Sequence, residues 1–193
     1  MPFAVVGVNH RTAPIEIRER FAFSTDEMTD ALAHVLESDG VREAALISTC
    51  NRTEFYLHAG EPSLAVPHVM QRLVEQADTL PKPAERYIYV KHGLDAVDHL
   101  YRVVAGLDSM VLGEVQIQGQ VRDAYELARS LTGQRQAVRA VFNRLFQSAL
   151  SVGGRVRSET RLSEGAASVP SAAVELARKI FGSLRGRRGL VLG

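Results

Sequence analysis

Two strand-like segments separated by only three residues limit the fold of this chain more than any other feature of its sequence. Residues 41–49 and 53–58 are mostly apolar or β-branched and are bounded by polar residues, which is typical of strands. A connection as short as residues 50–52 joins antiparallel neighbours in a tight hairpin. We therefore expect an antiparallel hairpin with Cys50 at its turn.

The segments around this hairpin predict a complete α+β unit. Residues 3–8 predict a first strand, and the capping box formed by Ser24 and Glu27 predicts the start of a helix. A second helix is expected at residues 66–77 and a fourth strand at 87–90. The resulting order β-α-β-β-α-β is that of the ferredoxin-like fold.

Helical patterns replace strands in the second half of the chain. Apolar residues recur at helical spacing in four segments, residues 96–104, 114–131, 137–156 and 171–181. Residues 189–193 then predict the start of another buried strand, and a strand without a partner suggests that the chain continues into a further domain. We expect a ferredoxin-like subdomain at residues 1–92, a helical part of the same domain at 93–165, and the beginning of a truncated domain at 166–193.

The composition is that of an ordinary globular protein, with 46% hydrophobic and 23% charged residues. Cys50 is the only cysteine among 193 residues, which excludes an internal disulfide and indicates a reducing compartment. The N-terminus lacks the basic region of a signal peptide, and no apolar run approaches the roughly 18–20 residues of a membrane helix. No Cys/His cluster has the spacing of a zinc site. These features predict a cytoplasmic protein without a structural metal or a membrane segment.

Charge is distributed unevenly along the chain. Residues 1–133 carry 12 Lys/Arg against 19 Asp/Glu, a net charge of −7, whereas residues 134–193 carry 11 against 3, a net charge of +8. A basic segment behind an acidic domain favours contact with a polyanion, nucleic acid being the first candidate. A solvated helix face explains the same charges equally well.

Cys50 is the strongest candidate for chemistry. It follows a buried strand, at the rim of a sheet, where α/β proteins usually place ligands. Arg52 is a fixed cation two residues away and favours the reactive thiolate, while Thr49 and Asn51 supply hydrogen-bonding groups. The same position also suits a small buried hydrophobic residue, and the local sequence leaves both interpretations open.

Several stretches together resemble the glutamyl-tRNA reductase family. They are GVNHRTAP at residues 7–14, ISTCNRTE at 47–54, GLDSMVLGE at 106–114, QIQGQ at 116–120 and GRVRSET at 154–160. The resemblance extends from residue 3 to residue 193, and the stretches around Cys50 and between Gly106 and Gly113 are its most specific parts. Gln118 departs from the apolar residue that the family pattern leads us to expect.

This resemblance implies an NADPH-dependent oxidoreductase that converts glutamyl-tRNA into glutamate-1-semialdehyde, the first step of tetrapyrrole (porphyrin) synthesis from glutamate. The Cys50 thiolate would attack the glutamyl ester and release the tRNA, and hydride would reduce the resulting thioester. A nicotinamide domain and a dimerisation domain follow in the family, so most NADPH contacts are expected beyond Gly193. The implied partners are glutamyl-tRNA, a second copy in a homodimer of the full-length protein, and a downstream aminotransferase.

The resemblance also implies which side chains serve the reaction. Cys50 is the expected nucleophile, and Arg52 is expected to hold the substrate's carboxylate, unless it merely tunes the thiol. His99 is expected near the cysteine as a proton acceptor or a support for the leaving oxygen, although satisfied histidines are also common in an amphipathic helix of this kind. His10 is a weaker candidate. Further substrate contacts are expected from residues that would otherwise be helix caps or exposed positions: Thr49, Asn51, Ser109, Glu114, Val115, Gln116 and Gln120. The first strand and first glycine of the Rossmann-type cofactor domain are expected at Gly189, Leu190, Val191, Leu192 and Gly193.

Two alternatives belong to other functional classes. One is a non-catalytic tRNA-binding module that kept the fold, and the other is a thiol esterase that hydrolyses glutamyl-tRNA without a cofactor. An acyl adduct on Cys50, its absence, or rapid release of free glutamate would separate the three possibilities.

Overall fold

The computed structural model describes residues 2–77, 80, 83–131, 136–162 and 169–190. Within this part of the chain, four strands form one sheet in the order β2-β3-β1-β4, and all neighbours are antiparallel. Both the order and the pairing are those of the ferredoxin-like fold, as predicted. The strands span Phe3–Asn9 (β1), Val41–Ser48 (β2), Arg52–Ala59 (β3) and Tyr89–His92 (β4).

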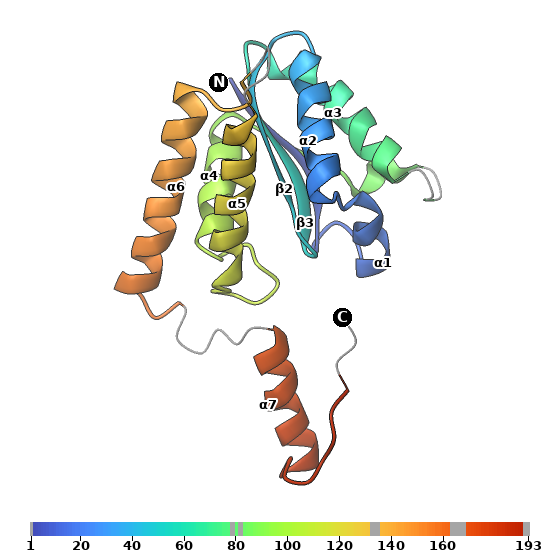
Figure 1. Ribbon diagram of the computed structural model, residues 1–193, viewed down its shortest axis with the longest axis vertical. Helices are drawn as coiled ribbons and strands as arrows, with labels where there is room; N and C mark the ends of the chain where they lie inside the picture. The colour runs from blue at the N-terminus through green and yellow to red at the C-terminus, as the bar shows by residue number, and fades with distance from the viewer. Residues whose placement is uncertain (1, 78–79, 81–82, 132–135, 163–168, 191–193) are drawn as a thin grey trace.

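Two helices, α2 (Thr25–Glu37) and α3 (Pro62–Gln76), cover one face of the sheet (Figure 1). The predicted capping box begins α2. The Ser24 hydroxyl accepts a hydrogen bond from the Glu27 backbone N–H at 3.4 Å, and the Glu27 carboxylate accepts one from the Ser24 backbone N–H at 2.7 Å. A one-turn helix, α1 (Ile15–Arg18), leads from β1 towards α2.

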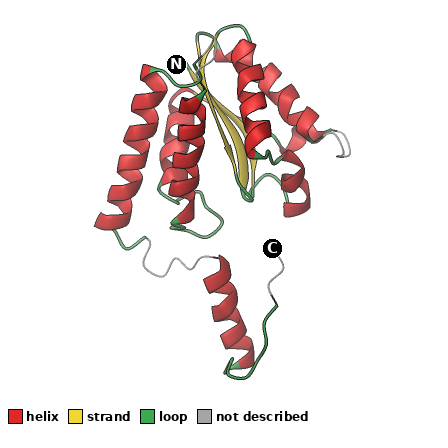
Figure 2. Ribbon diagram, in the orientation of Figure 1, coloured by secondary structure: helices red, strands yellow, loops and turns green. Residues whose placement is uncertain are grey.

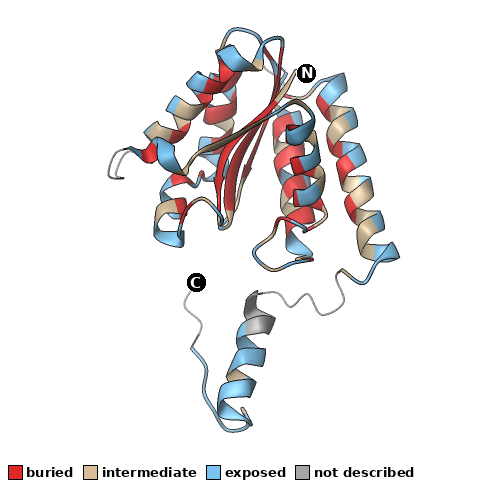
Figure 3. Cartoon of the chain, turned by 180° about the vertical axis from the view of Figure 1, so that it is seen from behind, coloured by how far each residue is buried: buried red, intermediate tan, exposed pale blue. Residues whose placement is uncertain are grey.

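Three helices cover the other face: α4 (Gly93–Val104), α5 (Gln116–Ser130) and α6 (Ala140–Glu159) (Figures 1 and 2). α4 packs on β1, α5 packs on β2, and α6 packs mainly on α4. Because both faces are covered, all eight residues of β3 are buried, and Figure 3 shows the inner strands as buried while the edge strand β4 is only partly buried. The central strand therefore takes its charged side chains into the interior.

Some predicted boundaries differ from those in the structure. The fourth strand begins at Tyr89 rather than at residue 87, because Ala84–Tyr87 form a 3-10 turn. α6 begins at Ala140 rather than at residue 137, because the preceding segment runs along the edge of β2, where the carbonyl of Ala137 accepts a hydrogen bond from the Ala44 N–H at 2.9 Å. The third helix begins at Pro62, four residues earlier than predicted, since proline is well tolerated in the first turn.

The predicted boundary at residue 92 coincides with the junction of β4 and α4. The helices after it pack directly on the sheet as a second layer, and the division into subdomains stays a prediction. A further helix, α7 (Val169–Phe181), follows. No helix in the described ranges is long and apolar enough to cross a membrane.

The strand expected at residues 189–193 is not formed in its described portion. Gly189 and Leu190 belong to no strand, and 83% of the Leu190 surface is exposed. Val191, Leu192 and Gly193 lie outside the described residues. An apolar strand is stable only between sheet neighbours, and Gly189 and Leu190 pair with no strand of the β2-β3-β1-β4 sheet.

Gln118, the residue that departs from the family pattern, is buried in α5 with its amide fully engaged. Its Nε2 donates to the carbonyl of Leu150 on α6 at 2.8 Å, and its Oε1 accepts from Arg157. A buried amide with partners for both ends costs little, so the departure is accommodated by a cross-link between two helices.

Candidate active site

Cys50 lies at the tip of the hairpin between β2 and β3 and is exposed to solvent. Thr49 closes the turn. Its backbone N–H donates to the carbonyl of Arg52 at 2.8 Å, and its hydroxyl accepts from the backbone N–H groups of Asn51 and Arg52, each at 3.2 Å. These bonds fix the backbone on both sides of the thiol and leave its side chain accessible. Exposure excludes the interpretation of Cys50 as a buried hydrophobic residue.

The segment after β1 clamps this turn from the other side. Arg18, which is buried in α1, donates from Nε to the carbonyl of Cys50 at 3.3 Å and from Nη1 to the carbonyl of Ala13 at 2.9 Å. The backbone N–H of His10 donates to the carbonyl of Asn51 at 3.0 Å. The cysteine is therefore presented by a backbone that hydrogen bonds hold on three sides.

Arg52 begins β3 and turns its side chain into the interior, where only 1% of it is exposed. Nη1 donates to the Glu54 carboxylate at 2.6 Å, and Nη2 donates to the backbone carbonyl of Asp108. The Asp108 carboxylate lies 3.3 Å from Nη2. The guanidinium is thus shared between two carboxylates.

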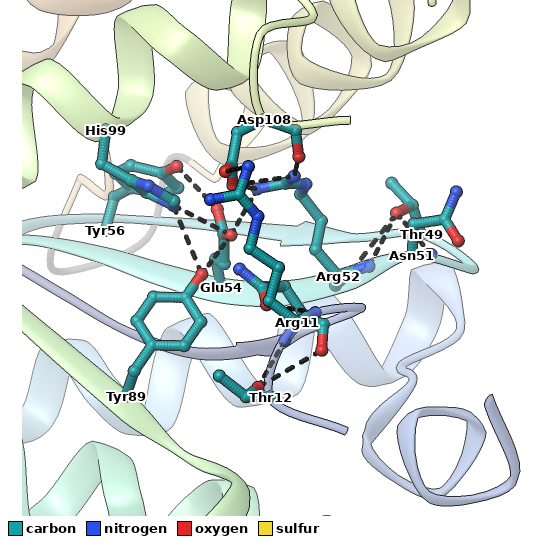
Figure 4. A network of polar contacts seen from close by, with 11 residues as sticks. Arg11, Thr12, Thr49, Asn51, Arg52, Glu54, Tyr56, Tyr89, His99 and Asp108 are labelled. Carbon is teal, nitrogen blue, oxygen red and sulfur yellow. Dashed lines mark hydrogen bonds and ion pairs between the residues drawn. The ribbon is translucent and has the colours of Figure 1, made fainter. Parts of the chain in front are cut away.

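Glu54 is the centre of this network, and its side chain is completely buried (Figure 4). Oε1 accepts from Arg52, from the Tyr89 hydroxyl and from His99, whose Nε2 lies 3.0 Å away. Oε2 accepts from the Tyr56 hydroxyl at 2.7 Å. Three elements, β3, β4 and α4, therefore meet on one carboxylate.

Gly7 of β1 makes room for this carboxylate. It pairs with Glu54 across the sheet, and a Cβ at position 7 would lie 2.4 Å from the Thr53 carbonyl oxygen and 2.8 Å from Cγ of Glu54. Real Cβ atoms essentially never show such distances. Only glycine allows the Glu54 side chain to lie over the neighbouring strand.

The loop between α4 and α5 (residues 105–115, the α4–α5 loop) closes the site from above. Asp108 of this loop joins two arginines, because its Oδ1 lies 3.0 Å from Nη2 of Arg11 while its Oδ2 faces Arg52. Gly106 and Gly113, at φ +75° and +79°, have a backbone conformation that favours glycine, and the Gly113 N–H donates to the Gly106 carbonyl at 3.0 Å. This hydrogen bond closes the two ends of the loop and places Asp108 against Arg52.

Two overlapping hollows of about 230 and 220 Å³ open beside this network. Both are lined by Arg11, Lys91, His99 and Asp108. Further charged groups of α4 border the first, and Asn9 at the end of β1, Thr12 of the following loop and Tyr89 border the second. A mixed-charge pocket of this kind suits a polar ligand that carries groups of both signs.

The network fixes the charge of its members. Burial alone would raise the pKa of Glu54, but Arg52 and the hydrogen bond from His99 hold that pKa well below its usual range. Burial opposes the charge of Arg52 too, yet Glu54 raises the pKa of the guanidinium above its ordinary value. Burial, followed by the charge of Glu54, raises the pKa values of Tyr56 and Tyr89. At neutral pH the centre is an ionised pair with two neutral phenol donors.

His10 has an unusual position beside the Cys50 turn. Its Nδ1 is buried and, within the described ranges, is the only buried side-chain N or O atom without a hydrogen-bond partner. Burial and then the charge of Arg52 lower the pKa of this histidine, so its neutral form prevails at neutral pH.

The sequence of the chain, including the segments that form this site, is similar to that of known proteins. Residues 6–160 match the family model of the N-terminal domain of glutamyl-tRNA(Glu) reductase. The chain belongs to the glutamyl-tRNA reductase family. It is 49% identical over 193 residues to a glutamyl-tRNA reductase of Rubrobacter xylanophilus, with 100% of this chain and 44% of that protein covered. It is 42% identical over 195 residues to a glutamyl-tRNA reductase of Natranaerobius thermophilus, with 42% of that protein covered.

The fold agrees with a solved structure of the same family. The glutamyl-tRNA reductase from Methanopyrus kandleri superposes with a TM-score of 0.67 at 35% identity, over 92% of this chain and 40% of that one. The chain thus spans less than half the length of the glutamyl-tRNA reductases it matches.

The structure brings together part of the set that family resemblance suggested. Thr49, Asn51 and Arg52 surround Cys50 in one turn, and Asp108 pairs with Arg52, whereas its half-buried chain neighbour Ser109 makes no hydrogen bond with this turn in the described structure. The remaining expected contacts follow at the start of α5, where they make no hydrogen bond or ion pair with the Cys50 turn in the described structure: Glu114, Val115, Gln116 and Gln120.

The structure shows which groups surround Arg52 and His99 in the free protein, and their expected roles stay predictions. Arg52 is not a free guanidinium, because Glu54 and Asp108 already occupy it. His99 is buried against Glu54 and Tyr89 and makes no hydrogen bond with Cys50. Strand geometry explains the direction of Arg52, since residues 52 and 54 face α4 while Cys50 lies beyond the strand.

Sequence reasoning missed five members of the site. The network needs Glu54, Tyr56, Tyr89, Asp108 and Arg11, none of which was singled out. One signal was available for the first two. Polar or aromatic residues alternate at positions 52, 54, 56 and 58 along a strand expected to be central, which places them on one buried face. The described residues contain no cluster of three His, Cys, Asp or Glu suited to a metal ion.

Proposed function

We propose that this chain carries the acyl-transfer centre of a glutamyl-tRNA reductase in tetrapyrrole synthesis. The observation that supports this most is the single exposed cysteine, Cys50, held on a hydrogen-bonded turn within the region that matches the family. The Cys50 sulfur attacks the carbonyl carbon of glutamyl-tRNA, a C–S bond forms, and the ester C–O bond breaks. The thiol proton leaves with the 3′ oxygen of the tRNA, and a glutamyl thioester remains.

Reduction of this thioester by NADPH belongs to the same proposal, but we assign no hydride-transfer step to the described residues. A dinucleotide needs a strand followed by a glycine-rich turn, and Gly189 and Leu190 form no strand. Binding of NADPH by residues 189–193 stays a prediction, because Val191, Leu192 and Gly193 lie outside the described residues. The expected homodimer, the aminotransferase partner and the cytoplasmic location stay predictions.

Arg52 is proposed to hold the substrate's side-chain carboxylate after a rearrangement. Glu54 is completely buried and fixed by four donors, whereas the Asp108 side chain lies on a loop and retains 11% exposure. Asp108 is thus the carboxylate that gives way, and Arg11 is positioned to retain it. Substrate binding then exchanges one carboxylate for another on the same guanidinium.

Acyl transfer is tested by mass spectrometry of the chain after reaction with glutamyl-tRNA. We expect a glutamyl adduct on the peptide that contains Cys50, and none with uncharged tRNA. In Cys50→Ser the adduct disappears while tRNA binding persists, because a hydroxyl ionises far less readily than a thiol. Substantial turnover by this variant would contradict the thioester mechanism.

The same experiment separates the two alternative functions. A tRNA-binding module would bind glutamyl-tRNA without any adduct on Cys50. A cofactor-independent thiol esterase would release free glutamate rapidly, and the release would depend on Cys50. Adding NADPH to parallel samples shows whether any semialdehyde forms.

A further inference from the structure

The buried Glu54 determines which nitrogen of His99 carries a proton. A carboxylate in its ionised form only accepts hydrogen bonds, and Arg52 keeps Glu54 ionised. His99 Nε2, at 3.0 Å from Glu54 Oε1, must therefore be the donor of that bond. The neutral imidazole is thereby restricted to the tautomer with the proton on Nε2 and a lone pair on Nδ1.

Aromatic neighbours hold the ring in this orientation. Tyr56 stacks on His99 with ring centroids 6.4 Å apart and an interplanar angle of 20°, and Tyr89 meets it edge-on at 5.7 Å and 73°. The Tyr89 oxygen also lies 3.3 Å from Nε2. Turning the ring over would remove the Nε2 hydrogen from both oxygens, so the orientation and the tautomer are fixed together.

The second nitrogen of His99 faces the pocket. His99 lines both hollows beside the site. Its Nδ1 has no hydrogen-bond partner among the described residues, and it is not among the buried atoms that lack one, so it is accessible from the pocket. The chain of contacts runs from Arg52 through Glu54 to His99, with a free lone pair at its end.

We propose that Glu54 is a positioning residue that presents His99 Nδ1 to the pocket as a hydrogen-bond acceptor for an ammonium or hydroxyl group of the ligand. The inference rests on the proposed function, because the ligand in question is the aminoacylated end of the tRNA. The acceptor would meet either the α-ammonium group of the glutamyl residue or a ribose hydroxyl of the terminal nucleotide. Arg52 and His99, which share hydrogen bonds to Glu54, would then bind opposite parts of one ligand.

Nuclear magnetic resonance of the imidazole nitrogens tests the tautomer without any assay of activity. The chain has six histidines, and His99→Gln identifies the signals of His99. We expect a protonated Nε2 and an unprotonated Nδ1 in the wild-type chain at neutral pH. A wild-type His99 with its proton on Nδ1 would overturn the proposal. This readout stands even if Cys50 is never acylated, so the failure of the proposed function is distinguishable.

Glu54→Gln tests the functional consequence, with Glu43→Gln as a matched control. Glu43 is also a buried carboxylate of the sheet bonded to a histidine, His58 at 2.6 Å, but it contacts the start of α6 rather than the pocket. In Glu54→Gln we expect the Nδ1–H tautomer of His99 to appear and the single-turnover rate of Cys50 acylation to fall about tenfold or more. Glu43→Gln should retain both the tautomer and the rate.

Glu54→Asp and Tyr89→Phe complete the test if Glu54→Gln folds poorly. Aspartate restores a carboxylate and should recover the wild-type tautomer and part of the rate, which a role in packing alone would not predict. Tyr89→Phe keeps the ring but removes one donor to Glu54, and His99 should retain its Nε2 proton. An unchanged tautomer and acylation rate in folded Glu54→Gln would refute the assignment.

Discussion

At the scale of single residues, position 7 of β1 must be glycine because there is no room for a Cβ atom. A methyl group there would meet the Thr53 carbonyl at 2.4 Å, and this oxygen belongs to backbone in the central ladder and cannot move aside. We expect Gly7→Ala to lower the free energy of unfolding by about 2 kcal/mol, measured by urea denaturation. The substitution should also lower the rate of Cys50 acylation, because the added methyl group displaces Glu54.

Gly119 provides the matched control for this substitution. It lies within α5, and a Cβ there would meet nothing within 4 Å. Gly119→Ala should therefore raise stability by roughly 0.5–1 kcal/mol through helix propensity alone. Equal effects of the two substitutions would show that the contact between Gly7 and Glu54 does not constrain the strand pair.

The sequence predicted the position of Cys50 but not the surroundings of Arg52. A thiol just past an apolar strand is a local pattern, and exposure at a hairpin turn follows from it. The partners of Arg52 are 2 and 56 residues away, and the second arrives only because α4 packs on β1 and returns its loop over the sheet. Contacts of that separation depend on tertiary packing, which periodicity does not encode.

At the scale of elements, the α4–α5 loop governs access to Arg52. Asp108→Asn removes the charge that competes with a substrate carboxylate while preserving the shape of the side chain. We expect the KM for glutamyl-tRNA in Cys50 acylation to fall about fivefold, which corresponds to roughly 1 kcal/mol at 25 °C. The maximal acylation rate should change little, since the nucleophile and its turn are untouched.

Asp98→Asn is the control for the Asp108→Asn substitution. Asp98 borders the same hollow but pairs with Arg102 at 2.8 Å on an exposed part of α4 and makes no contact with Arg52. Its removal should leave the KM within about twofold of wild type, as expected for a surface pair. A higher KM in Asp108→Asn would mean that this aspartate orients Arg52 for the substrate instead of competing with it.

The elements themselves were largely predictable, and the exceptions have local causes. The capping box and the short hairpin are encoded by neighbouring residues and appear as expected. At the start of α6, Val141 is 39% exposed, whereas Phe142 beside it is buried. Adjacent apolar residues lie about 100° apart on a helix, so only the packing partner decides which of them faces inward.

At the scale of the whole molecule, the uneven charge distribution bears on how the proposed tRNA substrate would be bound. Arg139 and Arg144 are exposed at the start of α6 and belong to the basic part of the chain, while Arg135 lies outside the described residues. A solvated face and a phosphate-binding face look alike in the free protein. They differ in how binding responds to salt, because each phosphate contact releases condensed counterions.

We expect the double charge reversal Arg139→Glu and Arg144→Glu to weaken tRNA binding by the 193-residue chain and to flatten its salt dependence. Loss of two phosphate contacts should reduce the slope of log K against log salt by about 2. The control reverses Arg20 and Arg42, two exposed arginines of the acidic part, and changes the net charge by the same amount. If both pairs alter binding equally, the effect reflects overall charge. If only the α6 pair changes the slope, the start of α6, which lies beside Glu43 at the end of β2 opposite the Cys50 turn, carries the phosphate contacts.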